Sequence, residues 1–183
     1  MLPPITKKLT VAWDQARAFR RFTDEIATWW PLRSHSVGQA RAESVVFEGR
    51  VGGRIIEKIR GGEESVWGTV TAWDPPRRVV FTWHPGDAPD KATEVEVRFE
   101  SVPGGTQLVL VHSKWEALGV LANTARRGYP IGWTYVLAQW ADRRWSPAVV
   151  AIAVLQRVMM PIAGKLAGRK LRKAAAQEAA ARG

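Results

Sequence analysis

The sequence predicts an α+β domain in which one face of an antiparallel sheet packs against a helix. Between residues 43 and 113, apolar and polar residues alternate in six short runs, and this period of two is typical of strands with one buried face. Short turn sequences rich in glycine and proline separate the runs, which favours an antiparallel meander. Helical spacing returns after the last run, so this later segment is expected to cover the sheet.

The chain opens with a strand and two short helices. Residues 5–11 alternate as the first predicted strand. Asp14 is a suitable N-cap for the first helix, because its side-chain oxygen can accept a hydrogen bond from the first helical turn. A second short helix is predicted to open at Thr23-Asp24 and to end before Pro31, since proline disfavours helical backbone in the residue before it.

Six further strands follow the two helices. Their predicted ranges are 43–48, 54–60, 65–73, 77–83, 93–100 and 106–113. Alternation places Phe99 on the inner face of the sheet and Glu96 on the outer face. It also places Glu57 and His112 on the inner face, whereas Trp67 is predicted to point outward. The apolar inner face therefore carries one carboxylate and one imidazole.

One helix, predicted over residues 131–144, covers this face. The residues that share its apolar side are Trp133, Val136, Leu137 and Trp140, which recur at helical spacing. We expect residues 1–145 to form the domain and residues 146–183 to form a helical extension, apolar at first and basic afterwards.

Length and composition exclude several classes of protein. A chain of 183 residues is the size of about one domain, and 46% hydrophobic with 24% charged residues is ordinary for a globular protein. The absence of cysteine excludes disulfides, thiolate metal sites and cysteine nucleophiles. The three histidines lie far apart, and the sequence carries no phosphate-binding or dinucleotide-binding glycine motif. We therefore expect neither a metal site nor a cofactor.

The net charge of +10 is concentrated in the extension. Residues 146–183 carry seven basic and one acidic side chain, a net +6, which leaves only +4 for the other residues. A mildly positive body does not favour a nucleic-acid partner. Arg157 and Pro161 interrupt the apolar part of the extension, which disfavours a membrane-spanning helix.

Two partners for the extension stay open. It can dock on the domain or on a second copy of the chain, which would give a homodimer. Alternatively, it can lie on an anionic membrane surface, because basic residues follow the apolar segment. The residues expected to contact the lipid headgroups are Lys165, Arg169, Lys170, Arg172 and Lys173.

Several motifs resemble those of a known superfamily. They lie at Thr23-Asp24, Trp29-Trp30-Pro31, 45–54, 67–70, 72–78, 81–83, 105–112 and Gly132-Trp133. Together they resemble the SRPBCC (START-like) superfamily over residues 5–144, and within it the branch grouped with activators of the heat-shock chaperone ATPase. The sequence differs from that branch at Lys114-Trp115, where a glycine is common.

The resemblance implies a helix-grip fold. In this fold a curved antiparallel sheet of six to seven strands wraps around a long C-terminal helix and encloses an elongated cavity. Relatives include lipid and hormone carriers, polyketide cyclases, oxygenase subunits and chaperone activators, so the resemblance by itself does not assign a function. Residues 146–183 lie outside the matched region.

Glu57 and His112 are the candidate polar residues of such a cavity. A buried carboxylate needs hydrogen-bond donors, and His112 is one possible partner. The pair could link two strands, orient a ligand carbonyl, or act as a general acid and base. The sequence leaves these three roles open, and also leaves open whether the two side chains meet.

Aromatic residues are the candidate apolar contacts for a ligand. They are Trp30, Phe81, Trp83, Phe99, Trp133 and Trp140, whose rings offer large apolar surfaces and, in tryptophan, an N–H donor. The alternative is that they simply fill the core. We expect access to the cavity between Trp30, Trp83 and Trp133, and we expect His35 and His84 to be solvated loop residues.

These observations favour a domain that binds a small, largely apolar molecule. The alternatives are a cyclase- or hydrolase-like enzyme that uses the same cavity, and a chaperone-binding module that uses its outer surface. The N-terminal residues lack the apolar stretch and cleavage site of a signal peptide, so a cytoplasmic location is expected.

Overall fold

The computed structural model describes residues 1–143, 146–147 and 150–151. Its strands are β1 (Ile5–Val11), β2 (Ala42–Phe47), β3 (Arg54–Ile59), β4 (Glu63–Asp74), β5 (Arg78–Trp83), β6 (Thr93–Val102) and β7 (Gly105–Ser113). They form one antiparallel sheet in the order β1-β7-β6-β5-β4-β3-β2. The helices are α1 (Gln15–Phe22), α2 (Ile26–Trp29) and α3 (Ala122–Trp140), and a 3₁₀ segment at Trp115–Leu121 precedes α3.

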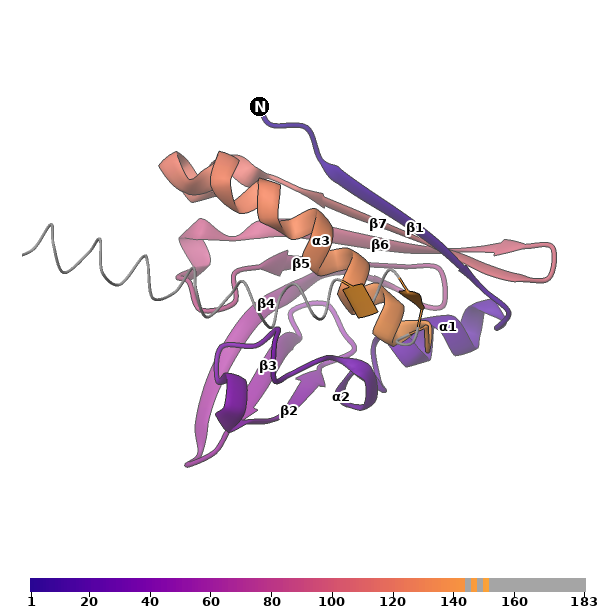
Figure 1. The fold of residues 1–183 in the computed structure, drawn as a ribbon, viewed down its shortest axis with the longest axis horizontal. Coiled ribbons are helices and arrows are strands. Elements are labelled where there is room, and N and C mark those ends of the chain that lie inside the picture. Colours follow the sequence, from indigo (N-terminus) through magenta and orange to yellow (C-terminus); the bar gives the residue numbers. More distant parts are fainter. Residues whose placement is uncertain (144–145, 148–149, 152–183) are drawn as a thin grey trace, which may run out of the picture. The chain divides into compact units, whose positions relative to one another are not determined.

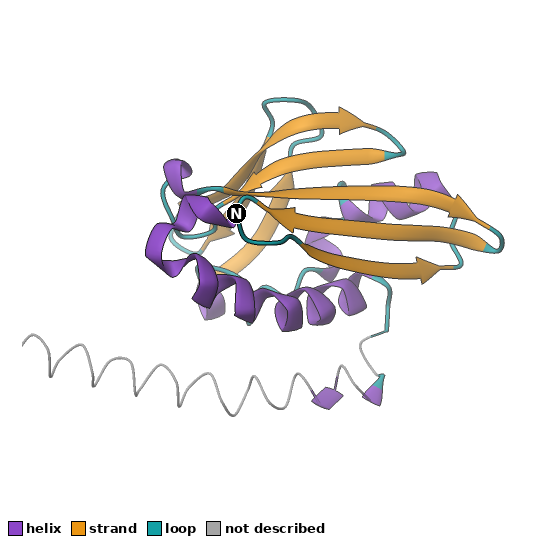
Figure 2. Ribbon diagram, turned by 90° about the horizontal axis from the view of Figure 1, so that it is seen from above, coloured by secondary structure: helices purple, strands orange, loops and turns teal. Residues whose placement is uncertain are grey.

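This architecture confirms the predicted α+β fold. The sheet curls around α3, which lies along its concave face (Figures 1 and 2). Residues 1–143 form one compact unit, and residues 144–183 form a second. The homodimer and membrane predictions fall almost wholly on residues 152–183, outside the described part of the chain.

Local sequence predicts the start of α1 and the end of α2, but the predicted opening of α2 at Thr23-Asp24 is wrong: Thr23 ends α1, and α2 begins at Ile26. Asp14 caps α1, and its side chain accepts a hydrogen bond of 2.8 Å from the backbone N–H of Arg17. The second helix, α2, ends at Trp29, two residues before Pro31. Phe19 and Phe22 on α1 are buried, so this helix packs an apolar face against the core.

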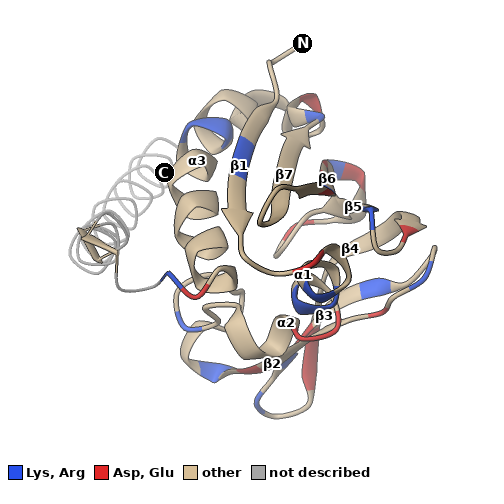
Figure 3. Cartoon of the chain, turned by 90° about the vertical axis from the view of Figure 1, so that its right-hand side faces the viewer, with Lys and Arg blue, Asp and Glu red and all other residues tan. Residues whose placement is uncertain are grey.

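Ion pairs line the convex face of the sheet. Arg78 on β5 pairs with Glu96 on β6 at 2.6 Å, and Lys114 pairs with Glu94 at 2.6 Å. Figure 3 shows basic and acidic segments next to one another on the strands and their turns. Exposed pairs of this kind contribute about 0–1 kcal/mol each, so the fold depends mainly on its concave face.

The main helix differs from the prediction at both ends. It runs from residue 122 to residue 140 instead of from 131 to 144, and it passes through Pro130. A proline inside a helix loses one backbone hydrogen bond and typically costs about 3 kcal/mol, but Tyr129 and Trp133 flank it and pack against the core. After Trp140, Asp142 adopts left-handed backbone (φ 55°), which ends the helix.

The outward prediction for Trp67 is wrong, because the strand does not alternate regularly there. Ile55 pairs with Gly68, whereas Ile56 pairs with Val66. Trp67 is therefore the extra residue of a β-bulge, and a bulge redirects the side chains around it. The Trp67 side chain is fully buried in the core.

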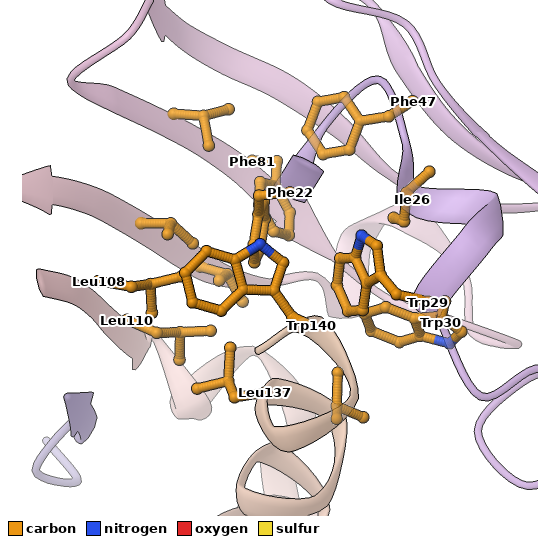
Figure 4. Close-up of a cluster of buried hydrophobic side chains, with 14 of the residues drawn as sticks. Phe22, Ile26, Trp29, Trp30, Phe47, Phe81, Leu108, Leu110, Leu137 and Trp140 are labelled. Atoms are coloured by element: carbon orange, nitrogen blue, oxygen red, sulfur yellow. The ribbon is translucent and has the colours of Figure 1, made fainter. Parts of the chain in front are cut away.

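Aromatic and aliphatic side chains fill the space between the sheet and α3. Figure 4 shows Trp140 reaching from the end of α3 into this cluster, with Leu108 and Leu110 to one side and Trp29 and Trp30 to the other. Trp140 is fully buried. The helix is thus held to the sheet chiefly by the burial of large apolar side chains.

Candidate ligand-binding interior

His112, on β7, takes part in a buried hydrogen-bond network that links two strands to α3. Its Nε2 lies 2.7 Å from the hydroxyl oxygen of Thr93 on β6, and its Nδ1 accepts a hydrogen bond of 3.0 Å from Trp133 Nε1. The Thr93 hydroxyl in turn donates to the carbonyl oxygen of Trp83 at 2.9 Å. The imidazole is fully buried, and the rings of Trp115 and Tyr129 pack on it.

These partners determine the tautomer of His112. An indole nitrogen only donates, so Nδ1 of His112 carries no proton and Nε2 must carry one. The Nε2–H then donates to Thr93, whose own hydrogen is used by Trp83. Burial lowers the pKa of His112 to about 3, so the ring is neutral at neutral pH. Both nitrogens are occupied, which excludes His112 as a general base in this conformation.

Glu57, on β3, is surrounded by hydrogen-bond donors. Its carboxylate accepts from the backbone N–H of Val37 at 2.9 Å, from that of Gly38 at 2.8 Å, and from Trp67 Nε1 at 2.9 Å. The side chain is fully buried. Glu57 therefore fastens the loop between α2 and β2 to the sheet, as buried charges require several donors.

Glu57 and His112 do not meet. Strands β4, β5 and β6 separate β3 from β7, a distance of about 19 Å along the sheet at roughly 4.8 Å per strand. Each side chain has its own set of partners. Of the roles left open by the sequence, the structure thus removes a Glu57–His112 hydrogen bond and a catalytic pair formed by these two residues.

Four tryptophans form a contiguous cluster between these two polar residues. Ring-centroid distances are 5.2 Å for Trp30–Trp67, 5.7 Å for Trp30–Trp83 and 5.8 Å for Trp83–Trp133. Trp30, Trp83 and Trp133 are 8%, 6% and 3% exposed. The predicted access point between these three rings is therefore closed in the described conformation.

The other predicted aromatic residues lie on either side of this cluster. Phe81 is buried and packs edge-on against Trp83 with centroids 5.8 Å apart. Phe99 and Trp140 contact one another at 6.3 Å and belong to a group around Phe22. All eight predicted site residues are thus buried, and the six aromatic ones fall into two adjoining groups.

Two buried indole nitrogens lack a hydrogen-bond partner. They are Nε1 of Trp83 and Nε1 of Trp140, and no other buried side-chain nitrogen or oxygen in the described residues is unpaired. Burial raises the pKa of Tyr129; the indole N–H of Trp83 opposes the rise, and the charge of Asp87 adds to it.

The two loop histidines are less solvated than predicted. His84 is 6% exposed, and its Nδ1 lies 3.1 Å from the carbonyl oxygen of Asp87, so the prediction of a solvated residue is wrong. His35 stacks on Tyr135 of α3 with centroids 5.2 Å apart, and burial lowers its pKa. Within the described ranges, no group of three or more acidic or histidine side chains is arranged to hold a metal ion.

Sequence reasoning missed Trp67, Thr93 and Tyr129. A bulge is not visible in the alternation pattern, so Trp67 was assigned to the wrong face. Thr93 is the first residue of β6 and Tyr129 lies before a helix-interior proline. Thr93 could have been found from the sequence, because it lies two residues before the inward-facing Val95 and residues two apart in a strand share a face.

The comparisons with known proteins agree with this fold. The family model described as Activator of Hsp90 ATPase homolog 1-like protein matches residues 13–143. The chain belongs to this family. The match confirms the resemblance to the chaperone-activator branch of the SRPBCC superfamily, while a search of the curated proteins finds no match.

Several solved structures share the fold. An anthrahydroquino-gamma-pyrone synthase, Txn09, complexed with SUM, is 32% identical with a TM-score of 0.55, covering 78% of this chain and 97% of that one. The Aha1 dimer from Colwellia psychrerythraea is 19% identical with a TM-score of 0.57, covering 77% and 95%. CalU16 from Micromonospora echinospora is 19% identical with a TM-score of 0.55, covering 84% and 82%.

None of the helices in the described residues is long and apolar enough to cross a membrane.

Proposed function

We propose that this chain binds a small, largely apolar molecule between the concave face of the sheet and α3. One observation carries the proposal: this interior is walled by aromatic rings, and two indole N–H groups in it have no partner. Small-molecule sites typically combine apolar walls with a few polar groups that fix the orientation of the ligand. Membership of the chaperone-activator family is compatible with such a domain.

The proposal retains the eight predicted residues and divides their roles. The aromatic wall consists of Trp30, Phe81, Trp83, Phe99, Trp133 and Trp140. Glu57 and His112 act indirectly, because their hydrogen-bonding groups are already occupied: Glu57 holds the loop at Val37, and His112 orients Trp133. Since neighbouring rings are in contact, a ligand can enter only if these side chains move apart.

Native mass spectrometry of gently purified protein tests the proposal. We expect an additional mass that is lost on acid denaturation, and quenching of tryptophan fluorescence when 1-anilinonaphthalene-8-sulfonate is added. Trp83→Leu is expected to reduce both signals, whereas Val46→Ala, an exposed position on β2, serves as the control. Failure to retain any molecule, together with no binding of the probe, would contradict the proposal.

A second candidate, a cyclase-like enzyme, is favoured by the 32% identical structure, which is named as a synthase. An enzyme in this interior would have to use a proton donor other than His112, because that ring is neutral and fully bonded. Incubation with an aromatic polyketide, followed by chromatography and mass spectrometry, tests for turnover. Product formation that survives His112→Gln would favour the enzyme and exclude acid–base chemistry at His112.

The remaining alternative is a chaperone-binding module that uses the outer surface. The family description gives this alternative its support. Stimulation of a heat-shock chaperone ATPase by protein with the mutation Trp83→Leu would favour the module, because that change affects only the interior. Loss of stimulation with Trp83→Leu, but not with Val46→Ala, would link the two functions.

For the extension we propose a homodimer contact, and we propose a cytoplasmic location for the chain. One structural neighbour is named as a dimer. Light scattering of the full chain and of residues 1–145 tests the contact. The proposal requires the full chain to have twice its monomer mass and residues 1–145 to have the mass of one monomer. Flotation with anionic vesicles tests the membrane alternative, and neutralising Lys165, Arg169, Lys170, Arg172 and Lys173 should then abolish flotation.

A further inference from the structure

Three tryptophan rings close the interior, and one of them, Trp30, begins a loop. Trp83 lies on β5 and Trp133 lies within α3, whereas Trp30 follows the four-residue helix α2 and opens the connection to β2. The Trp30 ring packs on Trp83 and Trp133 with centroids 5.7 and 6.2 Å apart. A rearrangement of this loop can therefore separate one of the three rings from the other two without breaking a strand or α3.

The backbone of residues 31–38 in this loop is bonded only locally. The N–H groups of Ser34 and His35 both donate to the carbonyl oxygen of Pro31. In the described part of the chain, no backbone–backbone hydrogen bond joins residues 31–38 to a strand or to α3. Segments held in this way open more readily than strands, because few contacts have to break.

Three side-chain contacts hold residues 31–38 in place. The Glu57 carboxylate accepts from two backbone N–H groups at the end of the segment that leads to β2. The imidazole of His35 stacks on Tyr135 of α3, with centroids 5.2 Å and planes 20° apart. The carbonyl oxygen of His35 accepts a hydrogen bond of 2.6 Å from Trp30 Nε1. His35 is thus the residue that links the Trp30 ring to α3.

We propose that residues 31–38 are the gate of the apolar site and that the stacking of His35 on Tyr135 is the latch of this gate. When the His35 ring leaves Tyr135, the carbonyl group that binds the Trp30 indole moves with it. The Trp30 ring then separates from Trp83 and Trp133 and admits a ligand, while Glu57 keeps the segment attached to β3. This inference rests on the proposed function and states how the same site opens.

An engineered disulfide tests the gate, since the chain has no cysteine of its own. A Cβ at Gly86, in the turn between β5 and β6, would lie 3.5 and 4.0 Å from the two methyl carbons of Val37. A protein with both Val37→Cys and Gly86→Cys can therefore form a disulfide that keeps the gate on this turn. The probe is 1-anilinonaphthalene-8-sulfonate in stopped-flow fluorescence. We expect the oxidised protein to bind it about tenfold more slowly than the same protein after reduction.

The reduced double variant is the matched control. Gly86 has left-handed backbone (φ 79°), so a cysteine there is strained. This strain is present in both the oxidised and the reduced protein, and the comparison of their rates isolates the effect of the tether.

Two substitutions of His35 test the latch. His35→Ala removes the stacking but keeps the carbonyl group that binds Trp30. We expect probe binding and probe release both to become about fivefold faster, with an unchanged Kd, because the stacking is lost whether or not the site is occupied. His35→Phe keeps a flat ring and should return both rates to within about twofold of the wild type.

The outcomes separate this inference from the proposed function. Equal binding rates for the oxidised and reduced double variant, with the probe still bound, overturn the gate and leave apolar binding standing. Unchanged rates in His35→Ala, or a changed Kd with an unchanged binding rate, also overturn the inference. If the disulfide does not form, the two His35 variants decide the question. A wild-type protein that does not bind the probe overturns the inference together with the proposed function.

Discussion

The two polar side chains that the sequence places on the inner face, Glu57 and His112, are stabilised in opposite ways. The Glu57 carboxylate receives three hydrogen bonds, two of them from the backbone of a loop. His112 is neutral, donates one hydrogen bond and accepts another, and its partners lie on a strand and a helix. Glu57 therefore fastens a loop to one end of the sheet, whereas His112 fastens α3 to the other.

The difference shows which polar atoms remain for a ligand. Both residues look like functional groups in the sequence, yet both are fully occupied by their own protein. Among the buried side chains of the described residues, the atoms left unpaired are the indole nitrogens of Trp83 and Trp140, in side chains that a hydrophobic pattern classes as core. A buried charge or imidazole must be satisfied by the fold itself, and this requirement leaves the weaker N–H donors free.

The largest expected effect is at Glu57. Glu57→Gln replaces one carboxylate oxygen by an amide that donates, so at least one buried N–H loses its acceptor. We expect the free energy of unfolding to fall by about 3 kcal/mol, measured by urea denaturation. Glu100→Gln, which is half-exposed at the end of β6, is the control and should change stability by less than about 0.5 kcal/mol. Equal effects would mean that the loop contact contributes little.

The pH dependence of stability tests the neutral state of His112. Its folded pKa of about 3 lies below an unfolded value of about 6.5, so the unfolded chain takes up the proton first as the pH falls. The contribution is complete above about pH 6.5 and is lost progressively towards pH 3. Between pH 7.5 and 5, the wild type should lose about 2 kcal/mol more than His112→Gln. His35 is present in both proteins, so its contribution cancels. If the unfolding free energies of the two proteins fall in parallel with pH, a neutral, buried His112 is contradicted.

A pair of tryptophan substitutions isolates one hydrogen bond in the Glu57 region. Trp67 and Trp140 are both fully buried, but only Trp67 donates, to Glu57. Trp67→Phe and Trp140→Phe remove similar volumes, so the difference between their unfolding free energies reports the indole–carboxylate bond. We expect Trp67→Phe to be the more destabilising by about 1.5 kcal/mol. A larger loss for Trp140→Phe would refute the assignment.

The smallest effects concern two glycines, one in the loop that Glu57 binds and one on α3, which His112 binds. A Cβ at Gly38 would lie 2.8 Å from Glu57 Oε1 and 2.9 Å from Ile59, whereas one at Gly128, on α3, meets nothing within 4 Å. Gly38→Ala should therefore destabilise the protein, by about 1 kcal/mol. Gly128→Ala should stabilise it by about 0.5–1 kcal/mol, because alanine favours the helix. Thermal unfolding measures both changes in stability. If both substitutions stabilise the protein, the close packing around Gly38 is contradicted.

The alternation of apolar and polar residues was sufficient to predict the strands wherever it is regular. Strand β1 was predicted at its observed bounds, and the other six strands within about two residues, because alternation with one buried face is a local property. Pattern failed where tertiary contacts override a local rule. The packing of Tyr129 and Trp133 against the core favours a helix that continues through Pro130, and a single extra residue in β4 turns Trp67 inward.

The amino-acid sequence by itself determined the seven strands, the two short helices, the family and the list of eight buried residues, since each of these follows from periodicity or from short motifs. Only the tertiary structure decided how those residues are used. Strand order separates Glu57 from His112, and three-dimensional contacts supply each with its partners. Whether a buried polar atom is satisfied depends on atoms distant in the chain, so the unpaired donor at Trp83 could be found only in the folded protein.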